Sequence, residues 1–150
     1  MEHKHKILSA DTDAELIEAF IAENCAVPLV VSGNSMIPFL KDGRDTVYLY
    51  SVTDSLKRGD IVFYKRDNGA YVLHRICKIN GDTYSLVGDA QSFIEHGIRR
   101  DQIVAVVTLV YRKGKYIGKR NLIWQFFAKI WIRMIKLRPW VLKTYTRFKR

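Results

Sequence analysis

Apolar positions near the start of the chain repeat at the spacing of an amphipathic helix. They follow Thr12-Asp13-Ala14-Glu15, which has the spacing of a capping box, and they comprise Leu16, Ile17, Phe20 and Ile21. The pattern predicts a helix from about residue 12 to residue 24, with its acidic side chains facing solvent.

Between residues 28 and 111 the pattern changes to short apolar runs separated by turns rich in Gly, Asp and Asn. β-Branched and aromatic residues are frequent in these runs, as they are in strands. Asp67-Asn68-Gly69 and Asn80-Gly81-Asp82 predict hairpin turns on either side of one long strand. The predicted strands are 29–31, 46–50, 61–64, 71–79, 83–87 and 103–111. We therefore expect a mainly β fold with an N-terminal helix.

Residues 119–150 show a third pattern, in which a nearly continuous apolar run contains one narrow polar stripe. The stripe consists of Gln125, Lys129, Arg133 and Lys136. It predicts an amphipathic helix over residues 121–138, which Pro139 would end or kink. We accordingly divide the chain into a β domain at residues 1–118 and a basic helical tail at residues 119–150.

Charge is distributed unevenly along the chain, whose net charge is +10. Residues 1–111 contain 12 Lys and Arg against 15 Asp and Glu, whereas residues 112–150 contain 13 Lys and Arg and no acid. A basic amphipathic helix is typical of segments that lie on an anionic membrane surface. Alternatives are packing on the β domain and docking onto a partner protein. We do not expect nucleic acid as a partner, because no nucleic-acid-binding fold is recognisable.

Two further features concern location and cofactors. Residues 1–24 have no secretory signal pattern, and no uncharged apolar window reaches about 18 residues. We therefore expect a peripheral protein at the cytoplasmic face of a membrane. Cys25 and Cys77 lie in apolar contexts without metal-ligand spacing, which predicts buried, reduced thiols. No metal or cofactor is expected.

The candidate chemistry is a hydroxyl and an imidazole. Ser35 lies in Ser32-Gly33-Asn34-Ser35-Met36-Ile37-Pro38, a loop that follows an apolar run, and His74 lies in the predicted strand 71–79. A serine nucleophile needs a base, and histidine is readily tuned for that role. Taken singly, each residue has a more ordinary interpretation, as a turn serine and a core histidine.

Motifs in a fixed order link the two residues. The serine loop is followed by Asp42-Gly43-Arg44-Asp45, then by residues 56–62, 72–76 and Gly88-Asp89. Over residues 28–111 this order resembles the signal peptidase I and LexA-like serine peptidase superfamily. The resemblance implies a compact LexA/signal-peptidase-like β domain, with Ser35 as nucleophile and His74 as base. Many relatives have Lys at the base position, whereas the endoplasmic-reticulum-type signal peptidases have His, and the chain resembles these most.

The resemblance leaves the third catalytic residue open between two carboxylates. Asp89 matches the first acid of the family motif, and Glu95 falls where the endoplasmic-reticulum type has the Asp that orients its His. Ala90-Gln91 replaces the Asn residues of that motif. Either carboxylate could fix the imidazole tautomer, and Asp89 could instead brace its loop.

The implied activity is a Ser/His cleavage of a leader or signal peptide from a precursor protein. Backbone amides of Gly33, Asn34 and Ser35 would hold the oxyanion. The peptide is expected to bind as an added strand, in contact with Met36, Tyr71, Val72 and Leu73. Alternatives are an inactive peptide-binding module of the same fold and a leader-peptide maturation factor acting in the cytoplasm. A regulator related to self-cleaving repressors is less favoured, because the chain has no helix-turn-helix pattern and has His at the base position.

Overall fold

The computed structural model describes residues 8–53 and 55–148. The first helix is α1 (Ala10–Ala22). The strands that follow are β1 (Val27–Val30), β2 (Asp45–Tyr50), β3 (Ile61–Lys65), β4 (Tyr71–Asn80), β5 (Thr83–Val87), β6 (Glu95–Arg99), β7 (Ile103–Arg112) and β8 (Lys115–Gly118). The C-terminal segment contains α2 (Leu122–Lys129), the 3-10 turns η2 (Trp131–Arg133) and η3 (Ile135–Leu137), and α3 (Arg138–Phe148).

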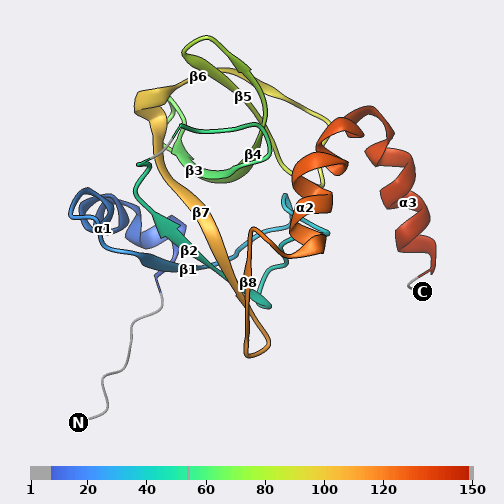
Figure 1. Cartoon of the computed structure of the whole chain (residues 1–150), viewed down its shortest axis with the longest axis horizontal. Helices are drawn as coiled ribbons and strands as arrows, with labels where there is room; N and C mark the ends of the chain where they lie inside the picture. The colour runs from blue at the N-terminus through green and yellow to red at the C-terminus, as the bar shows by residue number, and fades with distance from the viewer. Residues whose placement is uncertain (1–7, 54, 149–150) are drawn as a thin grey trace.

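All the strands belong to one antiparallel sheet with the order β1-β2-β7-β3-β4-β5-β6, and β8 pairs with β7. The long strand β7 joins the β1–β2 part of the sheet to the β3–β6 part, and α1 lies on the opposite side of the molecule from α2 and α3 (Figure 1). This confirms the predicted mainly β fold with an N-terminal helix.

Two hydrophobic clusters lie on the two faces of the sheet, because successive side chains of a strand point to opposite faces. Ile61 and Phe63 of β3 belong to the larger cluster, here called the main core, which also includes Ile17 of α1. Val62 and Tyr64 of the same strand belong to the smaller cluster, here called the second core.

The ends of the predicted elements differ from the observed ones for local reasons. The first helix begins at Ala10 after Ser9, so the capping box predicted at residues 12–15 is wrong. Instead, the Asp13 carboxylate accepts a hydrogen bond from the Ser9 amide at 3.0 Å. Strands β6 and β8 escaped prediction because they are short and rich in polar residues. Cys25 and Cys77 are free thiols, but neither is fully buried as predicted, since Cys25 is exposed and Cys77 is half-buried.

The tail is not the single helix predicted over residues 121–138. The α-helix ends at Lys129, and two 3-10 turns lead into α3. The turns allow Trp131 to enter the main core, and Pro139 lies in the first turn of α3, where its missing N–H is tolerated. Trp124 and Phe127 of α2 also pack into the main core.

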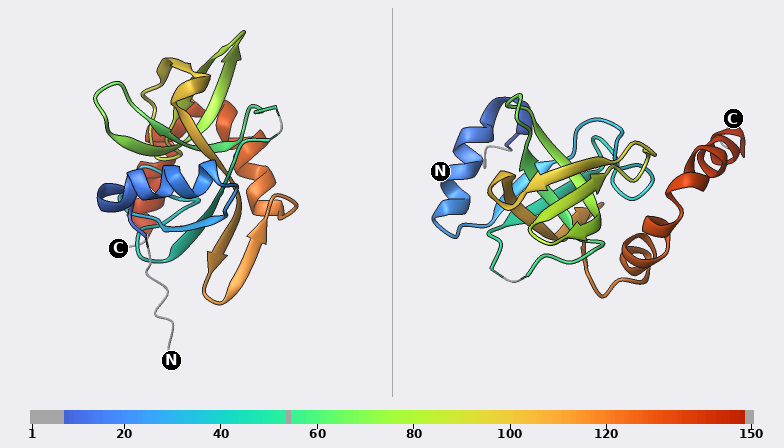
Figure 2. Two further views of the ribbon diagram at one scale, coloured as in Figure 1. Left: turned by 90° about the vertical axis from the view of Figure 1, so that its left-hand side faces the viewer. Right: turned by 90° about the horizontal axis from the view of Figure 1, so that it is seen from above.

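Val141 and Leu142 of α3 also pack against the main core, and α3 forms the outer edge of the molecule on this side (Figure 2). None of the helices in the described residues combines the length and the apolar content needed to cross a bilayer. Residues 1–7 of the predicted β domain and residues 149–150 of the predicted tail lie outside the described residues.

Candidate functional site

Ser35 lies in the loop between β1 and β2, which apolar anchors and one carboxylate hold in place. Met36 and Phe39 are buried in the main core, whereas Ser35 is half-buried. Gly33 has a φ of +79°, a conformation that side chains disfavour, and its amide donates to Asp42 at 2.9 Å. The Gly33 amide is therefore already bound, and the amides of Asn34 and Ser35 are the remaining candidate donors for an oxyanion.

A cavity of about 200 Å³ opens beside Ser35. Its walls come from β1, the serine loop, β3, β4 and the start of α1, which are far apart in the sequence. All four residues predicted to contact a peptide line it together with Gly33 and Ser35; they are Met36, Tyr71, Val72 and Leu73. The Tyr71 ring stacks on Phe63, and its hydroxyl donates to Glu18 of α1, so this wall is held from two sides.

The first part of β4 has an open edge at this cavity. Residues 71–74 pair with β3 on one side, but the pairing with β5 begins only at Arg75, which lies opposite Val87. Among the described residues, no strand pairs with the other edge of residues 71–74. Backbone groups of an extended peptide could therefore pair with this edge.

Residues 88–91 bring the end of β5 against the serine loop. The Ala90 amide donates to the Ser35 carbonyl at 2.9 Å. A Cβ atom added to Gly88 would lie 2.5 Å from the same carbonyl oxygen, so only glycine allows this approach. Since Val87 pairs with Arg75, this contact places the Ser35 backbone close in the fold to the β4 segment that contains His74.

His74 lies on β4 and packs into a buried environment, with only 3% of its surface exposed. Its Nδ1 is hydrogen-bonded to the Tyr64 hydroxyl at 3.1 Å. Burial lowers the pKa of His74 to about 4; the Glu95 charge opposes this shift and the Arg66 charge adds to it. The imidazole is therefore neutral near neutral pH.

Ser35 lines a cavity with Val72 and Leu73, which precede His74 on β4, but Ser35 and His74 are not hydrogen-bonded to each other within the described residues. Strand alternation places His74 on the face of Val72, which packs on the second core, whereas Leu73 packs on the main core. Catalytic hydrogen bonds often tighten only when substrate binds, so this arrangement is compatible with catalysis.

Glu95 begins β6 and reaches the surroundings of His74 through two other side chains. Arg66 forms an ion pair with it, with Arg66 Nε 3.2 Å from Glu95 Oε2. Burial raises the pKa of Glu95, but hydrogen bonding from Arg66 and then from Tyr64 outweighs burial and lowers that pKa overall. Glu95 is thus an ionised group near Tyr64, the hydrogen-bond partner of His74.

Asp89 has a different environment. Its two carboxylate oxygens accept from Nε and Nη2 of Arg75 at 2.9 and 2.8 Å, and both side chains are fully buried. Arg75 also donates to the Gly59 carbonyl at 2.8 Å. This bidentate pair ties the loop after β5 to β4 through a side chain, whereas the bracing considered for Asp89 from the sequence was through backbone hydrogen bonds.

Four residues at this site are absent from the predicted set. Tyr64 and Arg66 link Glu95 to His74, and Trp131 and Arg138 contact residues 88–91. In the sequence, Tyr64 does not differ from the other apolar residues of its strand, and Arg138 does not differ from the other cations of the tail. Neither residue could therefore be singled out before the structure.

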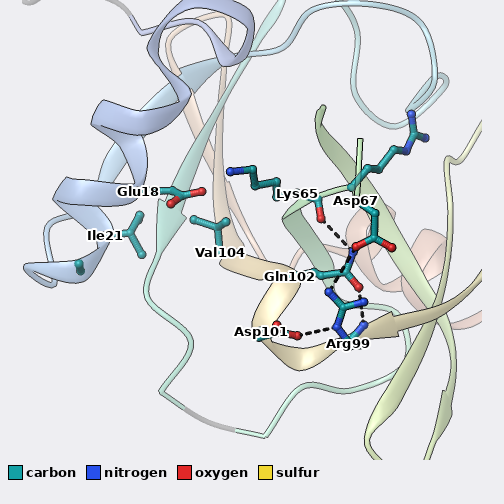
Figure 3. A pocket seen from close by; sticks show the side chains of 10 residues that line it. Glu18, Ile21, Lys65, Asp67, Arg99, Asp101, Gln102 and Val104 are labelled. Carbon is teal, nitrogen blue, oxygen red and sulfur yellow. Dashed lines mark hydrogen bonds and ion pairs between the residues drawn. The ribbon is translucent and has the colours of Figure 1, made fainter. Parts of the chain in front are cut away.

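A second cavity and a second Ser–His pair are weaker candidates for a functional site. A cavity of about 540 Å³ between α1 and the β3–β4 hairpin is lined by charged groups that bind one another, as Arg99 does with Asp67 and Asp101 (Figure 3). Ser85 is hydrogen-bonded to His96 at 2.9 Å, but Ser85 is buried within paired strands. In the described part of the chain, no group of three His, Cys, Asp or Glu side chains could hold a metal ion.

Comparison with known proteins agrees with this fold. Residues 3–110 match the family model described as Peptidase S24-like, a range that includes Ser35, His74 and Glu95. The match confirms the resemblance to the LexA and signal peptidase superfamily. No curated protein matches the chain. With a serine-peptidase-like fold over most of its length, the chain belongs to the Peptidase S24-like family.

Proposed function

We propose that the chain is a serine endopeptidase that removes a leader or signal peptide from a precursor protein. The observation that supports this most is the cavity beside Ser35, which adjoins the open edge of β4. An extended peptide can add to residues 71–74 there and bring a carbonyl carbon to the Ser35 hydroxyl. A cavity of about 200 Å³ has room for a side chain of the peptide next to the cleaved bond.

In the proposed mechanism, Nε2 of His74 takes the proton of Ser35 as Oγ attacks the peptide carbonyl. The amides of Asn34 and Ser35 stabilise the oxyanion of the tetrahedral intermediate. The intermediate collapses as His74 donates its proton to the leaving amine. Water, activated by the same imidazole, then hydrolyses the acyl-enzyme ester and releases Ser35.

The third member of the proposed site is Glu95, acting through Tyr64. A carboxylate only accepts hydrogen bonds, so the Tyr64 hydroxyl donates toward Glu95 and its oxygen accepts from Nδ1–H of His74. This arrangement leaves Nε2 unprotonated, as a general base requires. Asp89 is not needed for this role, since its oxygens are bound to Arg75.

A fluorophosphonate probe and a peptide cleavage assay test the proposal. Wild-type protein should be labelled at Ser35 and should cleave leader peptides, while Ser35→Ala should do neither. Ser85→Ala is the matched control, since it removes the hydroxyl of the other Ser–His pair and should react like the wild type. Equal turnover by wild type and Ser35→Ala would remove Ser35 from the mechanism.

A peptide-binding module without catalysis is the second candidate. It is favoured by one observation, the burial of His74 without a hydrogen bond to Ser35. If wild-type protein binds extended peptides but is neither labelled nor able to cleave them, this second function replaces the first.

For the tail we propose a membrane surface as partner. Apolar side chains of α2 and α3 that face solvent lie among lysines and arginines, with no acidic residue from position 112 onward. Anionic lipid attracts such segments, and the cytoplasmic leaflet is the one rich in it, so we place the protein at that face. Sedimentation with anionic vesicles tests the contact, and protease accessibility in intact and opened cells tests the face.

A further inference from the structure

The tail holds residues 88–91 by hydrogen bonds to their backbone. The indole Nε1–H of Trp131 donates to the Asp89 carbonyl at 2.8 Å. Nη1 of Arg138 donates to the carbonyls of Gly88 and Gln91 at 2.9 and 3.0 Å. Both donor side chains are buried, so water competes little for these bonds.

The other side of the same loop contacts the nucleophile loop. Ala90 donates to the Ser35 carbonyl, and Gly88 approaches that carbonyl too closely for any larger residue. Residues 88–91 are therefore held between the tail and Ser35. A displacement of this loop on the tail side would change the backbone position of Ser35.

Arg138 would only destabilise the fold if its side chain did no more than fill space in the interior. Its side chain is fully buried, it stacks on Trp131 with 5.3 Å between guanidinium carbon and ring centre, and its Nε has no partner in the described residues. The nearby Asp89 already pairs with Arg75. A buried cation with an unsatisfied N–H is destabilising, and an apolar residue of similar volume would avoid that penalty. What an apolar residue lacks is the planar set of donors that fixes several carbonyls at once.

We propose that Trp131 and Arg138 are positioning residues of the peptidase site, which hold residues 88–91 so that Ser35 keeps its reactive position. This inference rests on the proposed function. Both residues lie outside residues 3–110, so they add to what the family match covers. The tail then has a role at the active site that is independent of its role at a membrane.

Two variants remove the donors with little change in volume. Trp131→Phe keeps an aromatic ring and loses Nε1–H, and Arg138→Met keeps a long side chain and loses every guanidinium bond. Trp140→Phe is a control for the loss of an indole, because Trp140 is exposed on α3 and its side chain makes no hydrogen bond to residues 88–91 in the described chain. Arg100→Met is the second control, because Arg100 donates to the Ile103 carbonyl, away from the site.

Two measurements are needed on each variant. Amide hydrogen exchange at Ala90 reports the bond to Ser35, and we expect it to accelerate about tenfold in both tail variants. The fluorophosphonate labelling rate and kcat should fall about 10- to 100-fold with KM nearly constant, since a shift of about 1 Å at a catalytic group has that effect. Arg138→Lys should recover part of kcat, because an ammonium group can still donate to carbonyls. Both controls should stay within about twofold of the wild type on both measurements.

The outcomes separate this inference from the proposed function. Wild-type protein that neither labels nor cleaves would refute the peptidase, whatever the tail variants do. With an active wild type, an unchanged Ala90 exchange in both variants would overturn the inference. Faster Ala90 exchange with unchanged kcat would also overturn it, because the tail would then stabilise the loop without positioning Ser35.

Discussion

At the scale of single residues, His74 should make folding stability depend on pH. Its pKa is lowered by burial to about 4 in the folded chain, against an ordinary value of 6.5. A group with a lower pKa in the folded state stabilises the fold above its unfolded pKa and loses that contribution as the pH falls toward the folded pKa. We therefore expect stability to decrease from about pH 6.5 to about pH 4, by up to about 3 kcal/mol.

Urea unfolding at about pH 7 and about pH 4.5 measures this decrease. His74→Gln should lose most of it, because the variant has no imidazole to protonate in the core. His96→Gln serves as the control, since His96 is exposed and its variant should keep the wild-type decrease. The same decrease in His74→Gln and in the wild type would show that other groups cause it.

Tyr64 is the second residue with a specific expectation. Tyr64→Phe keeps the packing of the second core but removes the oxygen that binds Nδ1 of His74, so the imidazole tautomer is no longer fixed. We expect kcat to fall about 100-fold, and the ¹⁵N shifts of His74 to report a mixture of tautomers. Tyr84→Phe, in the same cluster, should leave both unchanged. Wild-type kcat and shifts in Tyr64→Phe would exclude the link from Glu95 through Tyr64.

At the scale of elements, the two candidate carboxylates should behave in opposite ways. Asp89→Asn breaks the buried pair that ties β4 to the loop after β5 and leaves Arg75 unpaired, so we expect a loss of about 3–5 kcal/mol in the free energy of unfolding. Glu95→Gln breaks a partly exposed pair with Arg66 and should lose at most about 1 kcal/mol, while kcat falls. Urea unfolding and kcat of both variants test this. Equal stabilities would reject the bracing role of Asp89.

Local patterns explain which elements were predictable. The strands from β1 to β5 and β7 have apolar runs bounded by turn residues, and these local signals agree with the final pairing. The prediction of a single tail helix over residues 121–138 was wrong because Trp131 and Ile132 are buried through 3-10 turns. The formation of these turns depends on the surface that the two side chains pack against.

Ser35 and His74 were selected as candidate site residues from the order of motifs. His74 binds Tyr64 of the second core, whereas Met36, next to Ser35, packs in the main core. The motifs do not contain this arrangement, because it depends on the strand register.

At the scale of the whole molecule, the charge asymmetry and the shape point to the same partner. The β domain has about as many acids as bases, while α3, at the outer edge of the molecule, contains Lys143 and Arg147 besides the buried Arg138, and no acid. Leu137 lies just before α3, Trp140 and Phe148 lie about two turns apart on it, and the three side chains are 57, 72 and 86% exposed. Water is an unfavourable environment for such side chains, and the interfacial layer of a bilayer is a favourable one.

The tail should therefore bind vesicles that contain anionic lipid, and bind them less as salt is added. Trp140→Ala combined with Phe148→Ala should weaken binding at every salt concentration, because burial of apolar area is not screened. Lys136→Gln and Lys143→Gln should each weaken it about fivefold at low salt, from about 1 kcal/mol per cation near the surface. Lys78→Gln, which removes an exposed cation of the β domain, is the control and should bind normally. Sedimentation with anionic vesicles measures the apolar and the charge contributions to binding together, and sedimentation with zwitterionic vesicles measures the apolar contribution alone. If the apolar double variant binds as well as the wild type, charge alone accounts for the lipid contact. The exposed apolar side chains would then be assigned to a protein partner.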